Sequence, residues 1–205
     1  MTLTFKSIGA YMKSTLEYYN KNFTTLIKRY EEAKPKEIHS LLIQYINKED
    51  SILELGFGSG RELNFLYKQG YKNLYGIDGS LKFVEYVQKR FSNKNNFTHS
   101  ILPQININGE FNFIYSIAVI MHLPHSTYKE LVKNIANKSA KNAKILFSFS
   151  LGARNDKERN FYEVNESLLE KLFQQKSIFK EKEFISQDSL NREIKWKNII
   201  YKRAI

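Results

Sequence analysis

Three glycines at alternate positions, Gly56, Gly58 and Gly60, follow the apolar run 52–55 and stand directly before a helical pattern. Glycine has no Cβ atom, so a ligand can touch the backbone of such a turn, and the free N–H groups of the following helix point toward it. Asp78 ends the next apolar run, about twenty residues further on, where an acidic side chain accepts hydrogen bonds from the two hydroxyls of a ribose. This spacing predicts a site for a cofactor that contains adenosine.

The position of the third glycine distinguishes between such cofactors. The dinucleotide fingerprint G-x-G-x-x-G requires glycine at position 61, where this chain has Arg61. A G-x-G-x-G turn preceded by an acid, here Glu54, is the pattern of S-adenosylmethionine sites, in which the turn holds an amino-acid tail. A glycine-rich turn that binds no ligand is the alternative interpretation.

Strand and helix patterns alternate from Ser51 onward, and these elements must position the residues above. Strands are expected at 51–55, 73–77, 96–99, 111–118 and 143–150, and helices at 60–70, 80–91 and 126–138. The strand runs are apolar on both faces, as in parallel strands that helices cover on both sides. A helix at 165–175 then leads to two longer alternating patterns, 177–186 and 193–203, joined by a turn near 188–191. Strands joined by such a turn are antiparallel, so the sequence predicts an α/β fold with an antiparallel sheet edge.

The first fifty residues carry only helical patterns. Apolar residues at intervals of three and four predict an amphipathic helix over 8–33, broken near Tyr19, and Pro35 starts a second helix. We expect a single domain over 1–205. It comprises a helical cap at 1–50, a cofactor-binding α/β core at 51–150, and a substrate-side loop, helix and edge strands at 151–205.

The composition restricts the class of protein. The chain has no cysteine, which excludes disulfides and cysteine-ligated zinc. It shows neither a signal peptide nor an apolar run long enough to cross a bilayer, so a cytoplasmic location without a membrane partner is expected. The net charge of +11 invites a nucleic-acid partner, but the basic residues are scattered and, at 180–183, interleaved with acids. A solvated basic surface is the favoured interpretation.

From Ser51 to the C-terminus the chain resembles class I S-adenosylmethionine-dependent methyltransferases. The matching segments, in the family's order and spacing, are the turn 54–60, Asp78, the strand 111–116 and the loop 118–124. Within the family, the segments 58–61, 121–124 and 188–196 are similar to a bacterial subgroup of small methyltransferases with uncharacterised substrates. The resemblance implies a three-layer Rossmann-like fold with a mostly parallel seven-stranded sheet, an antiparallel C-terminal strand pair and an N-terminal helical cap.

The resemblance also implies the cofactor, S-adenosyl-L-methionine, with S-adenosyl-L-homocysteine as product. The residues that it places at the cofactor are Glu54, Gly56, Gly58, Gly60, Arg61, Asp78, Gly79, Ser80, Ser100, Ile101, Ser116 and Ile117, with Tyr19 and Arg29 from the cap. Arg61 and Arg29 are candidates to pair with the cofactor carboxylate, and a solvent-facing or Asp-paired Arg61 is the alternative. Ser100 departs from the family, which usually has an acid there that contacts the adenine amino group.

The acceptor side is expected in the loop after the fourth strand and in the cap. His122 is the candidate for a base or a substrate contact, and a packed loop histidine is the alternative. The candidates for substrate binding are Tyr11, Tyr18, His122, Arg154 and Tyr162. No metal site is expected, because His125 follows His122 without further ligands nearby.

These observations predict an enzyme that moves a methyl group to a small-molecule or metabolite acceptor by in-line displacement. An RNA or protein methyltransferase that uses the basic surface, and a non-catalytic S-adenosylmethionine-binding regulator, are the alternatives. The segment 116–119 lacks the [Asp/Asn]-Pro-Pro-aromatic turn of DNA and RNA amino-group methyltransferases, and the lack of cysteine excludes the cysteine-nucleophile mechanism at carbon 5 of pyrimidines.

Overall fold

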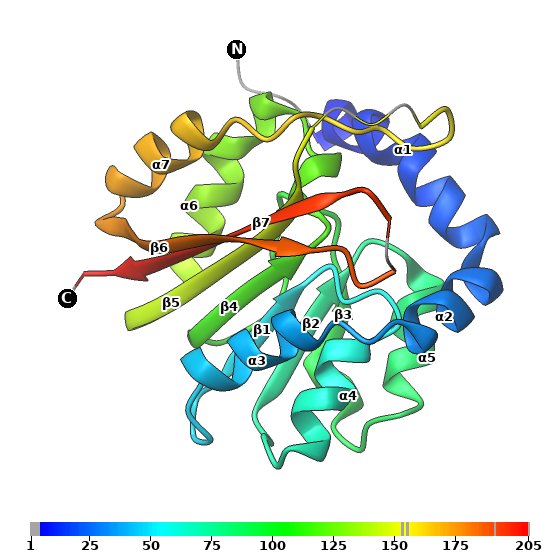
Figure 1. Cartoon of the computed structure of the whole chain (residues 1–205), viewed down its shortest axis with the longest axis horizontal. Coiled ribbons are helices and arrows are strands. Elements are labelled where there is room, and N and C mark those ends of the chain that lie inside the picture. The colour runs from blue at the N-terminus through cyan, green and yellow to red at the C-terminus, as the bar shows by residue number, and fades with distance from the viewer. Residues whose placement is uncertain (1–4, 153, 155, 191, 205) are drawn as a thin grey trace.

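In the described part of the chain, three helices come first, and strands and helices then follow one another in the order that the sequence predicts (Figure 1). The structure is a computed structural model that describes residues 5–152, 154, 156–190 and 192–204, with side chains from Met12 onward. The helices are α1 (Phe5–Lys21), α2 (Phe23–Glu32), α3 (Lys36–Tyr45), α4 (Arg61–Lys68), α5 (Leu81–Gln88), α6 (Tyr128–Lys138) and α7 (Glu166–Gln174). The strands are β1 (Ile52–Leu55), β2 (Leu74–Asp78), β3 (Phe97–His99), β4 (Phe111–Ile117), β5 (Ser139–Ser150), β6 (Ile178–Gln187) and β7 (Lys195–Arg203). None of the described helices has the length and apolar character that a membrane crossing demands.

The strands form one sheet in the order β3-β2-β1-β4-β5-β7-β6. Strands β1 to β5 run parallel, whereas β7 pairs antiparallel with both β5 and β6. The predicted Rossmann-like arrangement, with its antiparallel C-terminal pair, is therefore confirmed. The strand order reverses between β1 and β4, because the chain first moves outward through β2 and β3 and then returns. In open α/β sheets, ligands bind beyond the carboxyl ends of the strands at such a reversal.

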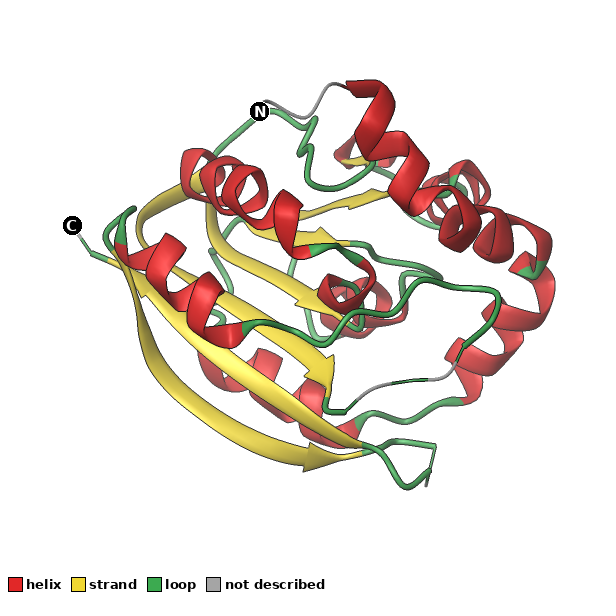
Figure 2. Cartoon of the chain, turned by 90° about the horizontal axis from the view of Figure 1, so that it is seen from above, coloured by secondary structure: helices red, strands yellow, loops and turns green. Residues whose placement is uncertain are grey.

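The sheet is covered on both faces (Figure 2). One apolar cluster packs α3, α4 and α5 against the sheet through residues such as Leu42, Leu66 and Phe83. The second cluster packs α6 and α7 against the opposite face, with Leu131 and Phe173 among its buried members. Burial on both faces explains why β1 and β4 carry apolar residues at consecutive positions.

The cap lies across the carboxyl ends of the parallel strands. Met12 and Leu16 of α1 pack with the cluster under α6 and α7, whereas Tyr18 and Tyr19 pack with the cluster under α5. The predicted break in the first helix occurs at Asn22, between α1 and α2, a few residues later than expected. Helix α1 thus bridges both faces of the sheet at the edge where the strand order reverses.

One boundary differs clearly from the prediction. The sequence predicts that the fifth strand begins at position 143, but β5 begins at Ser139. Asn142 has φ 59°, in the left-handed region that asparagine tolerates better than most residues. The strand therefore contains an irregular backbone position, and its pairing with β4 shifts register near Phe111.

Candidate functional site

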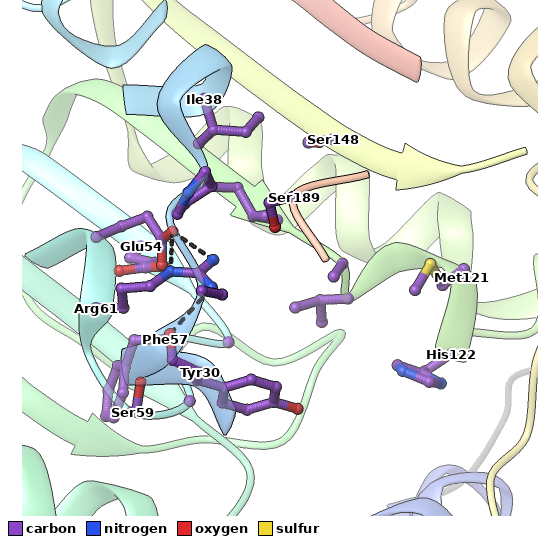
Figure 3. A pocket seen from close by; sticks show the side chains of 18 of the residues that line it. Tyr30, Ile38, Glu54, Phe57, Ser59, Arg61, Met121, His122, Ser148 and Ser189 are labelled. Atoms are coloured by element: carbon purple, nitrogen blue, oxygen red, sulfur yellow. Dashed lines mark hydrogen bonds and ion pairs between the residues drawn. The ribbon is translucent and has the colours of Figure 1, made fainter. Parts of the chain in front are cut away.

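A cavity of about 450 Å³ opens at the strand-order reversal, between the carboxyl ends of the strands and the cap. Its wall includes residues of α1 and α2, the turn after β1, the ends of β2, β4 and β5, and the segment between β6 and β7. Figure 3 shows Glu54 and Arg61 at one side of this cavity and Met121 and His122 at the other. Residues from both ends of the chain therefore line one cavity.

The glycine turn between β1 and α4 forms the wall on one side. Gly56 has φ 77°, and a Cβ atom there would lie 2.5 Å from Cγ2 of Val119, so both backbone and packing require glycine. Gly58 has φ 53°, and a Cβ atom there would lie 3.6 Å from Cε2 of Tyr30, an ordinary contact distance. Gly58 lines the cavity. Gly60, predicted at the cofactor, instead caps α4 and does not line the cavity.

Asp78, at the end of β2, faces the cavity beside this turn. Its Oδ2 accepts a hydrogen bond of 2.8 Å from the Gly58 N–H, and its Oδ1 accepts one of 2.8 Å from the Ser80 N–H. Burial raises the pKa of Asp78 to about 6, although these two hydrogen bonds oppose the shift. Each oxygen can accept further hydrogen bonds. Gly79 lines the cavity, whereas Ser80 caps α5 and lies behind the wall.

Glu54 and Glu62 form a buried acidic pair next to the glycine turn. Glu54 accepts a hydrogen bond of 2.9 Å from the Tyr115 hydroxyl, and burial and the Glu62 charge hold its pKa well above the usual range. Arg61 pairs with Glu62 at 2.6 Å and points its Nη1 toward the Tyr30 carbonyl at 3.4 Å (Figure 3). Arg61 is thus neither solvent-facing nor Asp-paired. Arg29 is exposed on α2 and lines the cavity.

The remaining residues predicted at the cofactor divide into two groups. Ile101, Ile117 and Ser100 line the cavity. The Ser100 hydroxyl is engaged within its own loop, since it donates to the Gln104 carbonyl at 2.8 Å and accepts from the Asn106 N–H at 3.1 Å. Ser116 does not line the cavity, because its hydroxyl turns inward and donates to the Leu55 carbonyl at 3.1 Å.

His122 is buried in the 3₁₀ turn after β4 and hydrogen-bonded at both ring nitrogens. Its Nδ1 lies 2.7 Å from the Asn160 carbonyl, which can only accept, so Nδ1 carries the proton. Its Nε2, 3.1 Å from the Tyr19 hydroxyl, is then the acceptor. Burial lowers the pKa of His122 to about 4, against the opposing effect of the Asn160 hydrogen bond. The ring is therefore neutral near pH 7, and its free nitrogen is already used by Tyr19.

Only some of the residues predicted to bind the substrate line the cavity. Arg154 lines the cavity, but Tyr18 and Tyr162 do not. Tyr18 supports the Arg159 guanidinium, 4.8 Å from its ring centroid, and the Tyr162 N–H donates to the Met121 carbonyl at 2.8 Å. The side chain of Tyr11 lies outside the part of the chain that the structure describes.

Several residues of the cavity wall were not predicted from the sequence to bind a ligand. The segment after β6 contributes Asp188 and Arg192, β7 contributes Trp196, and β5 contributes Ser148. The spacing Asp188…Trp196 was noticed as a likeness to a subgroup, but its contribution to the cavity depends on the β6–β7 pairing. Among the described residues, no group of three or more His, Asp or Glu side chains is arranged to hold a metal ion.

Comparison with known proteins identifies a family that the chain matches. A family model described as "Methyltransferase domain" matches residues 27–194. No curated protein matches the chain in sequence.

Solved structures share its fold at low sequence identity. The 1,6-didemethyltoxoflavin-N1-methyltransferase of Burkholderia thailandensis, solved with bound 1,6-didemethyltoxoflavin and S-adenosylhomocysteine, superposes with a TM-score of 0.78 at 11% identity, covering 100% of this chain and 94% of that chain. The magnesium protoporphyrin IX methyltransferase of Synechocystis PCC 6803 with bound S-adenosylmethionine gives a TM-score of 0.72 at 16% identity, covering 95% and 97%. A TehB-like S-adenosylmethionine-dependent methyltransferase of Corynebacterium glutamicum gives 0.68 at 18% identity, covering 93% and 99%.

Proposed function

The chain belongs to the methyltransferase-domain family, a class of S-adenosylmethionine-dependent enzymes, and we propose that it methylates a small-molecule acceptor bound in the cavity described above. The observation that carries this proposal is the cavity itself, which is lined by residues from several elements. Asp78 and the glycine turn form its donor side, and Trp196 and Arg154 from the C-terminal part of the chain form its other side. A wall built from both ends of the chain suits a small acceptor better than an extended polymer.

The residues at the donor side suit the methyl donor. Asp78 would accept hydrogen bonds from the ribose hydroxyls with the lone pairs that its two backbone donors leave free. Gly58 would let the backbone approach the methionyl tail, and Ile101 would pack against the adenine ring. The buried Glu54 carboxyl, whose pKa is raised by burial and by Glu62, favours a cationic neighbour such as the amino group of that tail.

Bound S-adenosylmethionine supplies a methyl carbon whose bond to sulfur breaks, with the electron pair kept by sulfur, as a lone pair of the acceptor forms the new bond. The protein's task is to hold the two reactants in line and to exclude water. We assign His122 a positioning role: it fixes the Tyr19 hydroxyl at the cavity wall and is neutral at pH 7. An acceptor atom that sheds its proton readily, or carries none, fits this site because the reaction then needs no general base.

Transfer of labelled methyl groups tests the acceptor class. The protein is incubated with methyl-labelled S-adenosylmethionine and an extract of the source organism, and the products are treated with nuclease or protease and separated by size. We expect label in low-mass material that survives both treatments, absent with Asp78→Ala and retained with Glu181→Ala, which removes an exposed acid on β6. Label in large material that nuclease or protease releases would replace the small-molecule acceptor with a nucleic acid or a protein.

A further inference from the structure

We propose, resting on the methyltransferase function above, that the acceptor carries a carboxylate and that Arg154 binds this group at the end of the cavity beside β7. Arg154 follows β5 and lines the cavity. Its Nε and Nη2 atoms are buried without a hydrogen-bond partner in the part of the chain that the structure describes. A buried hydrogen-bond donor without an acceptor costs free energy. A guanidinium with such donors at a cavity wall therefore indicates that a ligand supplies the acceptor.

Among the described residues, Arg154 forms no ion pair, whereas the two arginines near it do. Arg159 pairs with Asp156 at 2.6 Å, and Arg192 pairs with Asp188 at 2.6 Å. Three arginines therefore face two aspartates, and each aspartate is already bound by another arginine. Burial lowers the pKa of Arg154, and the neighbouring Arg192 and Arg159 charges act in the same direction, whereas Asp188 opposes them. A negatively charged group of the acceptor would neutralise the charge of Arg154.

Aromatic rings hold the guanidinium in place for this task. The Arg154 Cζ lies 5.2 Å from the ring centroid of Phe161 and 5.6 Å from that of Trp196. The Trp196 ring is fixed in turn, because its Nε1–H donates to Asp188 at 2.9 Å. A guanidinium held over aromatic faces keeps its donor edge free, and that edge matches the two oxygens of a carboxylate. Asp188 is thus a positioning residue for this wall.

Because Arg154 lies beside β7, a carboxylate bound to it would fix one end of the acceptor away from the methyl donor. Asp78 ends β2, whereas Trp196 belongs to β7, four strands away in the order β2-β1-β4-β5-β7. At the usual spacing of neighbouring strands this separates the two residues by roughly 19 Å. The attacked atom must lie between them, near the end of β4. Ser148, on β5, lines the cavity between these two ends; its hydroxyl has no hydrogen-bond partner among the described residues and can contact the body of the acceptor.

Titration of the S-adenosylhomocysteine-loaded protein with paired probes tests this site. The probes are benzoate and indole-3-acetate, and the controls are benzamide and indole-3-acetamide, which keep the shape and lose the charge. We expect the wild type to bind a carboxylate more tightly than its amide, and Arg154→Gln to weaken that binding by about 10- to 100-fold, the loss expected for a hydrogen-bonded charge pair. Arg154→Lys should restore part of the affinity, and Arg90→Gln, which removes a distant arginine paired with Glu31, should change nothing.

Three results would overturn the proposal. The first is equal binding of acids and amides by the wild type. The second is carboxylate binding that Arg154→Gln leaves intact. The third is a loss of S-adenosylhomocysteine affinity in Arg154→Gln, since Arg154 would then bind the carboxylate of the donor. A wild-type protein that labels no low-mass product from extract argues against the proposed function instead, and the titration still decides whether the anion site exists.

Discussion

The surroundings of His122 predict how the stability of the protein depends on pH. In the folded state burial lowers the pKa of His122 from 6.5 to about 4. Between these two values the unfolded chain binds a proton that the folded chain does not, so stability is full above pH 6.5 and falls as the pH drops toward 4. A shift of this size corresponds to a loss of about 3 kcal/mol at 1.36 kcal/mol per unit.

The variant His122→Asn isolates this contribution, because its amide can donate to the Asn160 carbonyl but does not titrate. We expect the free energy of unfolding of the wild type, minus that of the variant, to fall by about 3 kcal/mol between pH 7 and pH 4. Asp78 contributes with the opposite sign, since its raised pKa removes stability as the pH rises from 3.8 to about 6. That contribution is present in both proteins and cancels in the difference.

Urea unfolding at half-unit intervals from pH 4 to pH 7 measures this difference. The same experiment decides between the two interpretations of His122. A difference that stays constant over the whole range would refute the reasoning, since His122 would then titrate near its ordinary pKa. His122 would then be a candidate general base, because a ring nitrogen with an ordinary pKa can accept a proton at neutral pH.

Two further predictions concern the donor side of the cavity. Gly56→Ala should destabilise the protein by about 1–3 kcal/mol more than Gly70→Ala, because both positions have positive φ but only the Cβ at position 56 meets Val119. Urea unfolding compares the two variants, and equal losses would show that Val119 can move away. Tyr115→Phe should cost about 1–3 kcal/mol, because it removes the hydroxyl that donates to the buried Glu54 carboxyl. An unchanged urea midpoint would show that this hydrogen bond adds nothing to stability.

Local signals in the sequence predicted the donor side and the fold. The glycine turn and Asp78 meet at the cavity because one turn and the next strand end, about twenty positions apart, lie side by side in the sheet. The apolar runs predicted the parallel strands for a similar reason, since burial on both faces is visible in each run separately.

The acceptor side depends on contacts that no local pattern encodes. His122 is neutralised by burial and held by Asn160 and Tyr19, which are 38 and 103 residues away in the sequence. Arg154 meets Trp196 only because β7 inserts between β5 and β6. Even the pairing of Arg61 with its immediate neighbour Glu62 was missed, because the burial of Glu62 at the start of α4 decides it.

Calorimetric titration of the purified protein with S-adenosylhomocysteine and with NAD distinguishes a methyl-donor site from a dinucleotide site. The account predicts that S-adenosylhomocysteine binds and NAD does not. It also predicts that Asp78→Ala weakens binding at least about tenfold, the loss expected for hydrogen bonds to a charged group, whereas Glu181→Ala binds as the wild type does. Binding of NAD alone, or undiminished S-adenosylhomocysteine affinity in a folded Asp78→Ala protein, would contradict it.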